Sequence, residues 1–212
     1  MRPLIVALTI ASLGAGAAKP PTVIFLHGRI VEEAGERPTS PEFGVYEYHA
    51  ILDKLRAAGF TVLSERRAKD TDPDQYARHV ADQVTSLIRA GTPPSSITVV
   101  GFSKGSGIAL ISSSLLANPS VNFVFMAGCS EGAFNRPDFH VTGRMLSLYE
   151  ASDELAGSCA ALFAREGKGS VHAERRINLG LGHGTFFQPR SEWLDPAIDW
   201  VRTASDVTSS NR

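Results

Sequence analysis

The sequence predicts an α/β protein: a three-layer α/β/α sandwich around a mostly parallel sheet of about six strands. Short, continuous apolar runs alternate with segments whose apolar residues repeat at helical spacing. A chain of 212 residues, 43% of them apolar, is also long enough to enclose one core. Helices between consecutive strands favour parallel pairing through right-handed crossovers. Neither a repeat nor a linker divides the chain, so we expect a single domain.

The strand predictions rest on short apolar runs bounded by turn signals. The first run, TVIFL, is apolar throughout except for its opening threonine, as expected for a strand covered on both faces. The sixth is more polar and is expected at an edge of the sheet. The predicted strands cover residues 22–26, 60–63, 97–100, 121–126, 145–149 and 173–179.

The helix predictions rest on helical spacing and on signals at the helix ends. After the first strand, a polar loop leads into a helix that Gly59 is placed to end. Asp72 is the predicted N-cap of a second helix, with Pro73 at its first position. A small-residue helix is expected from about 103 to 117, and a last helix is expected to begin with Asp195 as its N-cap.

The first residues are typical of a secretory signal peptide. Arg2 precedes an apolar run at 4–13 and a small-residue tail at 14–18, in which Ala15-Gly16-Ala17 forms an Ala-x-Ala cleavage site. The alternative is a buried first strand within residues 4–10. The signal-peptide interpretation predicts that the protein is exported, to the periplasm or the extracellular space.

The expected organisation is therefore a signal peptide at 1–17 and a single domain at 18–212, whose tail from about 205 is disordered. Twenty-one basic and 22 acidic residues leave one net negative charge, which gives no field to attract a nucleic acid or an anionic membrane. No apolar run reaches the roughly 20 residues of a membrane span. We expect no metal or cofactor, because no spacing of His, Cys or Gly matches such a site, and we favour a monomer.

Residues 101–105 (GFSKG) match the pattern G-x-S-x-G. Because roughly 0.17 matches arise by chance in a chain of this composition, the context must decide. The match begins one residue after the predicted strand 97–100 and leads into a predicted helix, as a nucleophile elbow does. Glycine is expected at positions 101 and 105 on steric grounds, because the residues two positions before and after the serine crowd each other in such a turn.

With this motif, the mature sequence resembles the α/β-hydrolase superfamily over nearly its whole length, and most closely its small, lid-less secreted serine esterases. Members place a nucleophilic Ser, an acid and a His in that order along the chain. The resemblance implies Ser103 as the nucleophile, Asp153 as the acid and His183 as the base. In such a triad the histidine takes the serine proton and the carboxylate orients the imidazole.

The choice of acid leaves alternatives open. Glu150 and Glu154 lie in the same loop as Asp153, and Glu131 follows the fourth strand, where some relatives carry their acid. The histidine is better defined, because only His183 of the six histidines lies in a Gly-flanked loop after the final strand.

The resemblance also implies an oxyanion hole made by two backbone N–H groups. The N–H of Lys104, directly after the nucleophile, is the first donor. The second is assigned to Arg29, in the loop that opens with His27-Gly28, with Ile30 as the alternative. His27 is expected to brace this loop by hydrogen bonding.

Two loop lengths bear on the substrate. The interval 127–144 is too short for a cap domain, so an open serine is expected. The loop at 29–45 carries acidic residues and is expected to be solvated; a rim that disfavours anionic substrates is the alternative. The acidic residues of this loop are Glu32, Glu33, Glu36 and Glu42.

The two cysteines, Cys129 and Cys159, follow the fourth strand and the predicted acid loop. These strands are expected to be neighbours, so a disulfide that pins the acid loop is a hypothesis, against two free thiols.

The predicted function is hydrolysis of a small-molecule carboxylic ester through an acyl-enzyme intermediate. A serine peptidase or acyltransferase with the same triad is an alternative, and so is a non-catalytic binding protein built on this fold.

Overall fold

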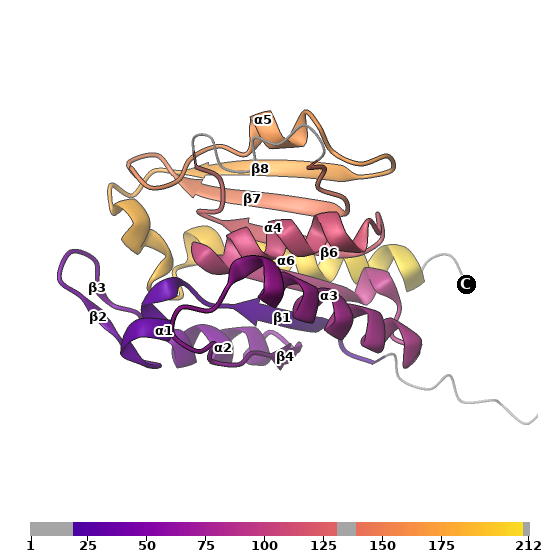
Figure 1. The fold of residues 1–212 in the computed structure, drawn as a ribbon, viewed down its shortest axis with the longest axis horizontal. Helices are drawn as coiled ribbons and strands as arrows, with labels where there is room; N and C mark the ends of the chain where they lie inside the picture. Colours follow the sequence, from indigo (N-terminus) through magenta and orange to yellow (C-terminus); the bar gives the residue numbers. More distant parts are fainter. Residues whose placement is uncertain (1–18, 131–138, 210–212) are drawn as a thin grey trace, which may run out of the picture.

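The structure is a computed structural model that describes residues 19–130 and 139–209. Its main sheet has six strands in the order β4-β1-β5-β6-β7-β8, and every pairing in it is parallel (Figure 1). The predicted three-layer fold class is confirmed. The strands of this sheet are β1 (Thr22–Leu26), β4 (Thr61–Leu63), β5 (Ile97–Phe102), β6 (Asn122–Met126), β7 (Arg144–Glu150) and β8 (Val171–Ile177).

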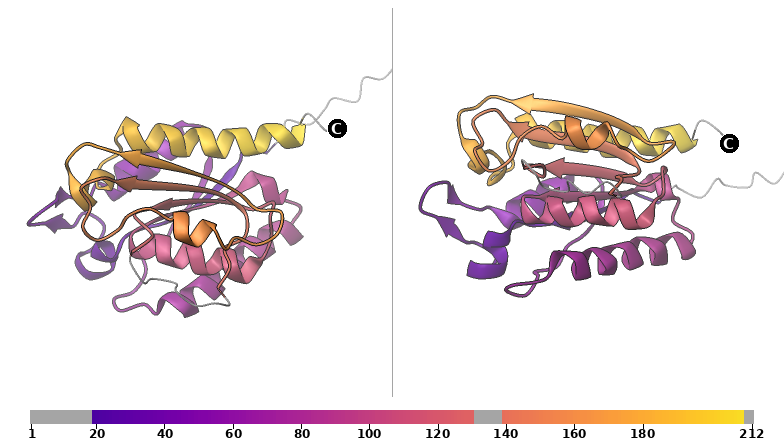
Figure 2. Two further views of the ribbon diagram at one scale, coloured as in Figure 1. Left: turned by 90° about the horizontal axis from the view of Figure 1, so that it is seen from above. Right: turned by 45° about the horizontal axis from the view of Figure 1, so that its top comes forward.

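Helices cover both faces of the sheet, with α2 and α6 on one face and α3 and α4 on the other (Figure 2). Successive residues of each strand alternate between the two cores: Phe25 joins the first, and Ile24 and Leu26 join the second. This double coverage explains why the central strands read as continuous apolar runs. The helices of the two layers are α2 (Tyr48–Ala57), α3 (Pro73–Arg89), α4 (Lys104–Leu116) and α6 (Ser191–Ser209).

The local signals act as expected at most helix ends. The side chain of Asp72 caps α3 by accepting the N–H of Gln75 at 2.7 Å, and Pro73 opens the helix. Gly59 adopts a φ of +95° directly after the end of α2, a conformation that favours glycine. The polar strand β8 lies at an edge of the sheet.

Two predictions of local structure were wrong. The segment after β1 is not only a polar loop: it forms a short helix, α1 (Arg29–Ala34), and a two-stranded hairpin of β2 (Thr39–Ser40) and β3 (Gly44–Val45). The last helix begins at Ser191, before Asp195, and its first turn contains Trp193, which is fully buried. Pro196 therefore lies inside α6 near its start, where its missing N–H removes only one hydrogen bond.

A further short helix, α5 (Ala160–Phe163), precedes β8, and two 3-10 turns, η1 (Pro94–Ser96) and η2 (Gly182–Phe186), complete the described part. The backbone of α6 is helical to Ser209, beyond residue 205, where the ordered domain was expected to end. The expected signal peptide at 1–17 and the alternative acid Glu131 lie outside the described residues.

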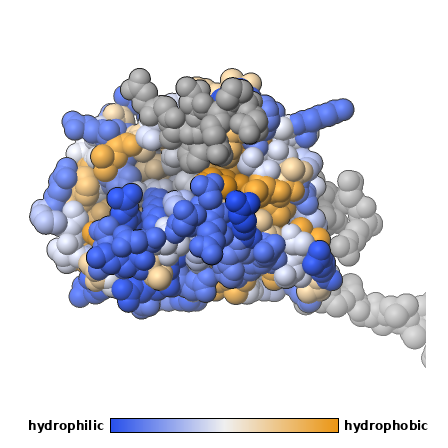
Figure 3. All heavy atoms as spheres, viewed as in Figure 1, coloured by the Kyte–Doolittle hydropathy of each residue, from blue (hydrophilic) through white to orange (hydrophobic). Residues whose placement is uncertain are grey.

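The face of the molecule seen in Figure 3 is largely hydrophilic over α3, with hydrophobic surface gathered higher on the same face. Within the described ranges, no helix combines the length and the apolar character needed to cross a membrane.

Candidate active site

Ser103 lies on a sharp turn between β5 and α4, at the carboxyl edge of the sheet. Its backbone has φ +54° and ψ −119°, a region that costs a non-glycine residue about 1–3 kcal/mol. The turn leaves no room beside it: a Cβ on Gly101 would lie 2.4 Å from the carbonyl oxygen of Gly105, and one on Gly105 would lie 2.0 Å from that of Leu26. Both glycines are therefore required by close backbone approach. This is the strand–turn–helix geometry of a nucleophile elbow.

His183 and Asp153 are brought together by the loops that follow the last two strands. Nδ1 of His183 lies 2.8 Å from Oδ2 of Asp153, and the Asp153 side chain is fully buried. Its other oxygen, Oδ1, accepts the N–H of Leu155 at 2.9 Å. Asp153 therefore holds His183 in the tautomer that protonates Nδ1 and leaves Nε2 free to accept a proton.

Ser103 and His183 line the same cleft. Among the described residues, the His183 side chain is hydrogen-bonded to Asp153, and no hydrogen bond joins Ser103 to His183. In free enzymes such bonds are often long, and they tighten when substrate binds.

Glu150, an alternative acid, has a different part in the structure. It is 1% exposed, and its hydrogen bonds to described residues do not include one to His183. Its carboxylate accepts the N–H groups of Leu179 and Gly180 at 3.0 and 3.2 Å and the hydroxyl of Thr185 at 3.3 Å. It also accepts the N–H of Ser152 at 3.4 Å. Glu150 thus ties the segment that carries Asp153 to the segment that carries His183.

The hydrogen bonds that Glu150 accepts from backbone N–H groups favour its charged form. Burial alone would raise the pKa of its carboxyl, but the N–H groups of Leu179, Gly180 and Ser152 together lower it more, so its pKa lies below the ordinary range of glutamate. The third candidate in this loop, Glu154, is exposed.

The expected oxyanion donors lie at the starts of two helices. Lys104 is the first residue of α4 and Arg29 the first of α1, so the N–H groups of both belong to helix starts, where helical geometry supplies no acceptor. A Cβ on Gly28 would lie 3.0 Å from the Phe102 ring and 3.7 Å from Cβ of Ser103, so the α1 turn passes close to Ser103. Ile30 lines the same cleft, one residue further on.

The cleft above Ser103 is open and has a volume of about 710 Å³. This size lies in the range of small-molecule sites. Phe43 and Leu155 form part of its wall, and the Phe43 ring lies 6.2 Å from the imidazole of His183. The remaining apolar lining comes from Ile30, Pro73, Phe102, Ile111 and Phe187.

Part of the acidic loop beside the cleft was wrongly expected to be solvated. Glu33, Glu36 and Glu42 are exposed, but Glu32 is buried and pairs with Arg67 and Lys104. Arg67 comes from the segment after β4, and no pattern in the sequence indicated it.

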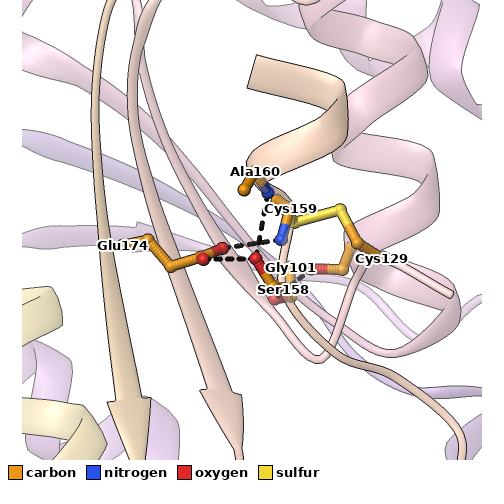
Figure 4. Close-up of a disulfide and its surroundings, with 7 residues drawn as sticks. Gly101, Cys129, Ser158, Cys159, Ala160 and Glu174 are labelled. Carbon is orange, nitrogen blue, oxygen red and sulfur yellow. Dashed lines mark hydrogen bonds between the residues drawn. A yellow bond between two sulfur atoms is a disulfide. The ribbon is translucent and has the colours of Figure 1, made fainter. Parts of the chain in front are cut away.

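A disulfide joins Cys129 to Cys159, with their Cα atoms 5.3 Å apart (Figure 4). Beside it, the N–H of Gly157 donates to the carbonyl of Cys129 at 2.7 Å. Glu174 on β8 accepts the N–H of Cys159 at 2.6 Å and the hydroxyl of Ser158 at 2.5 Å. The loop that carries Asp153 is therefore anchored at both ends, by Glu150 before it and by the disulfide after it.

No cluster of three or more His, Cys, Asp or Glu side chains within the described residues is arranged to hold a metal ion.

The fold of the chain is similar to that of proteins of known structure. No family model matches the chain, and no curated protein matches its sequence. Among solved structures, SOBER1 of Arabidopsis thaliana is 13% identical with a TM-score of 0.57, and the alignment covers 87% of this chain and 99% of that protein. Esterase PE8 is 16% identical with a TM-score of 0.55, covering 89% and 94% of the two chains.

A predicted CIB-like hydrolase of Thermoplasma acidophilum is 14% identical with a TM-score of 0.59, covering 88% of each chain. Each of these three alignments covers most of the length of the compared protein. The chain has the α/β-hydrolase fold.

Proposed function

We propose that the protein is a serine hydrolase that cleaves carboxylic esters, with Ser103, His183 and Asp153 as its triad. The observation that carries the proposal is the strained Ser103 turn, which opens into a cleft shared with a histidine oriented by a buried carboxylate. A residue in an unfavourable backbone region persists only where its surroundings impose it, and such residues gather at active sites. The name of esterase PE8, a protein of the same fold, is consistent with this activity.

In the proposed reaction Ser103 Oγ attacks the ester carbonyl carbon while Nε2 of His183 takes the hydroxyl proton. The carbonyl oxygen becomes an oxyanion that accepts the N–H groups of Lys104 and of Arg29. The intermediate collapses when the C–O bond to the alcohol breaks and the His183 imidazolium returns its proton to the leaving oxygen. Water then attacks the acyl-serine in the same way, and the acid and free Ser103 result. Asp153 keeps its charge throughout and stabilises the imidazolium.

The lining of the cleft favours an ester with an apolar acyl or alkyl part. Ile30, Phe43, Ile111 and Leu155 line the same cleft as Ser103 with apolar side chains. An ester of a short or medium chain buries apolar surface there at about 25 cal/mol per Å².

The test combines an active-site probe with ester turnover. Purified protein is treated with a fluorophosphonate and with p-nitrophenyl esters of increasing acyl length. We expect labelling at Ser103, and a loss of about 10⁴-fold in kcat for Ser103→Ala and for His183→Ala. His79→Ala, an exposed histidine on α3, is the matched control and should retain wild-type turnover.

Folded protein that neither reacts with the probe nor turns over any ester would refute the proposal. Turnover of a peptide amide in place of the esters would assign the same triad to a peptidase.

We also propose that the protein is exported. The signal-peptide pattern at residues 1–17 supports export, and the disulfide is compatible with it, since disulfides persist in oxidising compartments. Mass spectrometry of protein from the culture medium or periplasm should find a chain that starts after Ala17; an uncut chain in the cytoplasm would contradict the proposal.

A further inference from the structure

The N-terminal turn of α1 carries an expected oxyanion donor, but the helix cannot hold this position by itself. It has only six residues, and its N-cap, Gly28, offers no side-chain hydrogen bond. Isolated helices shorter than about 12 residues are marginal in water. The position of this turn beside Ser103 must therefore come from tertiary contacts.

Those contacts converge on one buried carboxylate. Glu32 is 1% exposed, and its two oxygens receive two cations: Nε of Arg67 at 2.6 Å and Nζ of Lys104 at 2.5 Å. Removing one partner from such a buried group leaves a costly unpaired charge, so the three side chains are strongly interdependent. Nε of Arg66 adds a hydrogen bond to the carbonyl of Val31 at 3.2 Å, at the other side of the same helix.

Arg67 also fixes the strand end from which α1 departs. Its backbone N–H donates to Nε2 of His27 at 3.0 Å, and its guanidinium donates to the carbonyl of His27. Nδ1 of His27 then carries the proton and donates to the carbonyl of Gly28 at 2.9 Å. Burial, and then the charge of Arg67, lower the pKa of His27 to about 4, so it is neutral at pH 7.

Lys104 joins this network to the nucleophile. Lys104 directly follows Ser103 and supplies the first expected oxyanion donor with its backbone N–H. Its side chain donates to Glu32 on α1, the helix that carries the second expected donor.

We propose that Lys104, Glu32 and Arg67 form an ion network that positions the α1 turn of the oxyanion hole against Ser103. The three side chains are positioning residues, since they act through the backbone donors. The inference rests on the proposed ester hydrolysis. It assigns a role to the residue after the nucleophile that the elbow pattern leaves unspecified.

The test compares Lys104→Met with Lys104→Arg, which keeps the charge, and with Lys54→Met, an exposed lysine on α2. Lys104→Met keeps the backbone N–H. A displaced donor costs about 10²-fold, so we expect kcat to fall about 10- to 100-fold with KM changed less than about 3-fold. Lys104→Arg should recover most of kcat, and Lys54→Met should behave as wild type.

The second readout is affinity for an aryl trifluoromethyl ketone, which forms an oxyanion on the serine. For Lys104→Met this affinity should fall in parallel with kcat/KM. Glu32→Gln should have the same effect, and because it can impair folding, it is interpreted only if its thermal unfolding is cooperative.

Wild-type kcat in Lys104→Met, or a rise in KM alone, would overturn the network proposal while leaving the proposed function intact. An equal loss in Lys54→Met would overturn it too. If wild-type protein neither hydrolyses esters nor reacts with a fluorophosphonate, the proposed function fails, and this inference fails with it.

Discussion

Replacement of Glu150 by glutamine tests whether one buried carboxylate holds together the loops that carry Asp153 and His183. Glu150 accepts backbone N–H groups from Leu179 and Gly180 after β8 and from Ser152 before Asp153. Glutamine has nearly the same shape but lacks the charge, and one of its two terminal atoms is a donor. The variant therefore changes the hydrogen bonding at this site with little change in packing.

The magnitude follows from the two shorter backbone contacts, those of Leu179 and Gly180. A hydrogen bond to a charged group contributes about 1.5–3 kcal/mol and a neutral one about 0.5–1.5, so the loss of charge at both costs about 2 kcal/mol. The amide nitrogen takes the place of the oxygen nearest to the Leu179 N–H, which keeps its contact of 3.2 Å with the other oxygen. We expect Glu150→Gln to lower the free energy of unfolding by about 2–3 kcal/mol at pH 7.

The pH dependence gives a second check. Because the pKa of Glu150 is lower in the folded protein than its unfolded value of about 4.3, its contribution is complete above about pH 5. It is lost as the pH falls through the folded-state pKa. The difference in stability between wild type and Glu150→Gln should therefore shrink in acid.

The assay is urea denaturation followed by tryptophan fluorescence, with the disulfide intact, at pH 7 and at about pH 3.5. Trp193 is fully buried and reports on the main core. Glu154→Gln, in the same loop but exposed, is the matched control and should change stability by less than about 0.5 kcal/mol. A loss below about 1 kcal/mol at pH 7, or an equal loss at both pH values, would refute this account of Glu150.

Three further predictions concern other parts of the chain. Asp153→Asn should keep the fold but lower kcat about 10⁴-fold, because the amide favours the wrong tautomer of the histidine; near-normal initial rates would exclude Asp153 as the acid. The double variant Cys129→Ser, Cys159→Ser should lose about 3–4 kcal/mol in urea denaturation, since the disulfide closes a loop with a sequence separation of 30; unchanged stability would show that the bond is absent or without effect. Asp72→Ala should lose about 1 kcal/mol with the α3 cap and leave kcat unchanged, and a thermal midpoint equal to that of wild type would contradict this role of the cap.

The parts of the structure that were predictable from sequence are those with a local or periodic signal. The strand TVIFL, the Asp72 cap and the glycine-flanked Ser103 turn each depend on residues within a few positions of one another. The fold class was predictable for the same reason, because alternating apolar runs and amphipathic helices fix the layers.

The remainder depends on contacts between distant segments. Glu32 looked like one of several solvated acids, and it is buried because Arg67 and Lys104, 35 and 72 residues further along the chain, reach it in space. No periodic pattern records such a pairing. Likewise the choice between Glu150 and Asp153 depends on how the last two loops meet, which spacing alone could not decide.

The parallel sheet also determines when the proposed site can form during folding. Ile24 on β1 pairs with Val99 on β5, 75 residues later, so even the central strands meet only after a long loop closes. Such non-local pairings form slowly, because the entropy of closure is lost before the contacts are gained. A chain folded only as far as β6 would contain Ser103 and the α1 turn but neither Asp153 nor His183. Recovery of the proposed esterase activity during refolding would therefore report the docking of β7 and β8, the last two strands of the sheet.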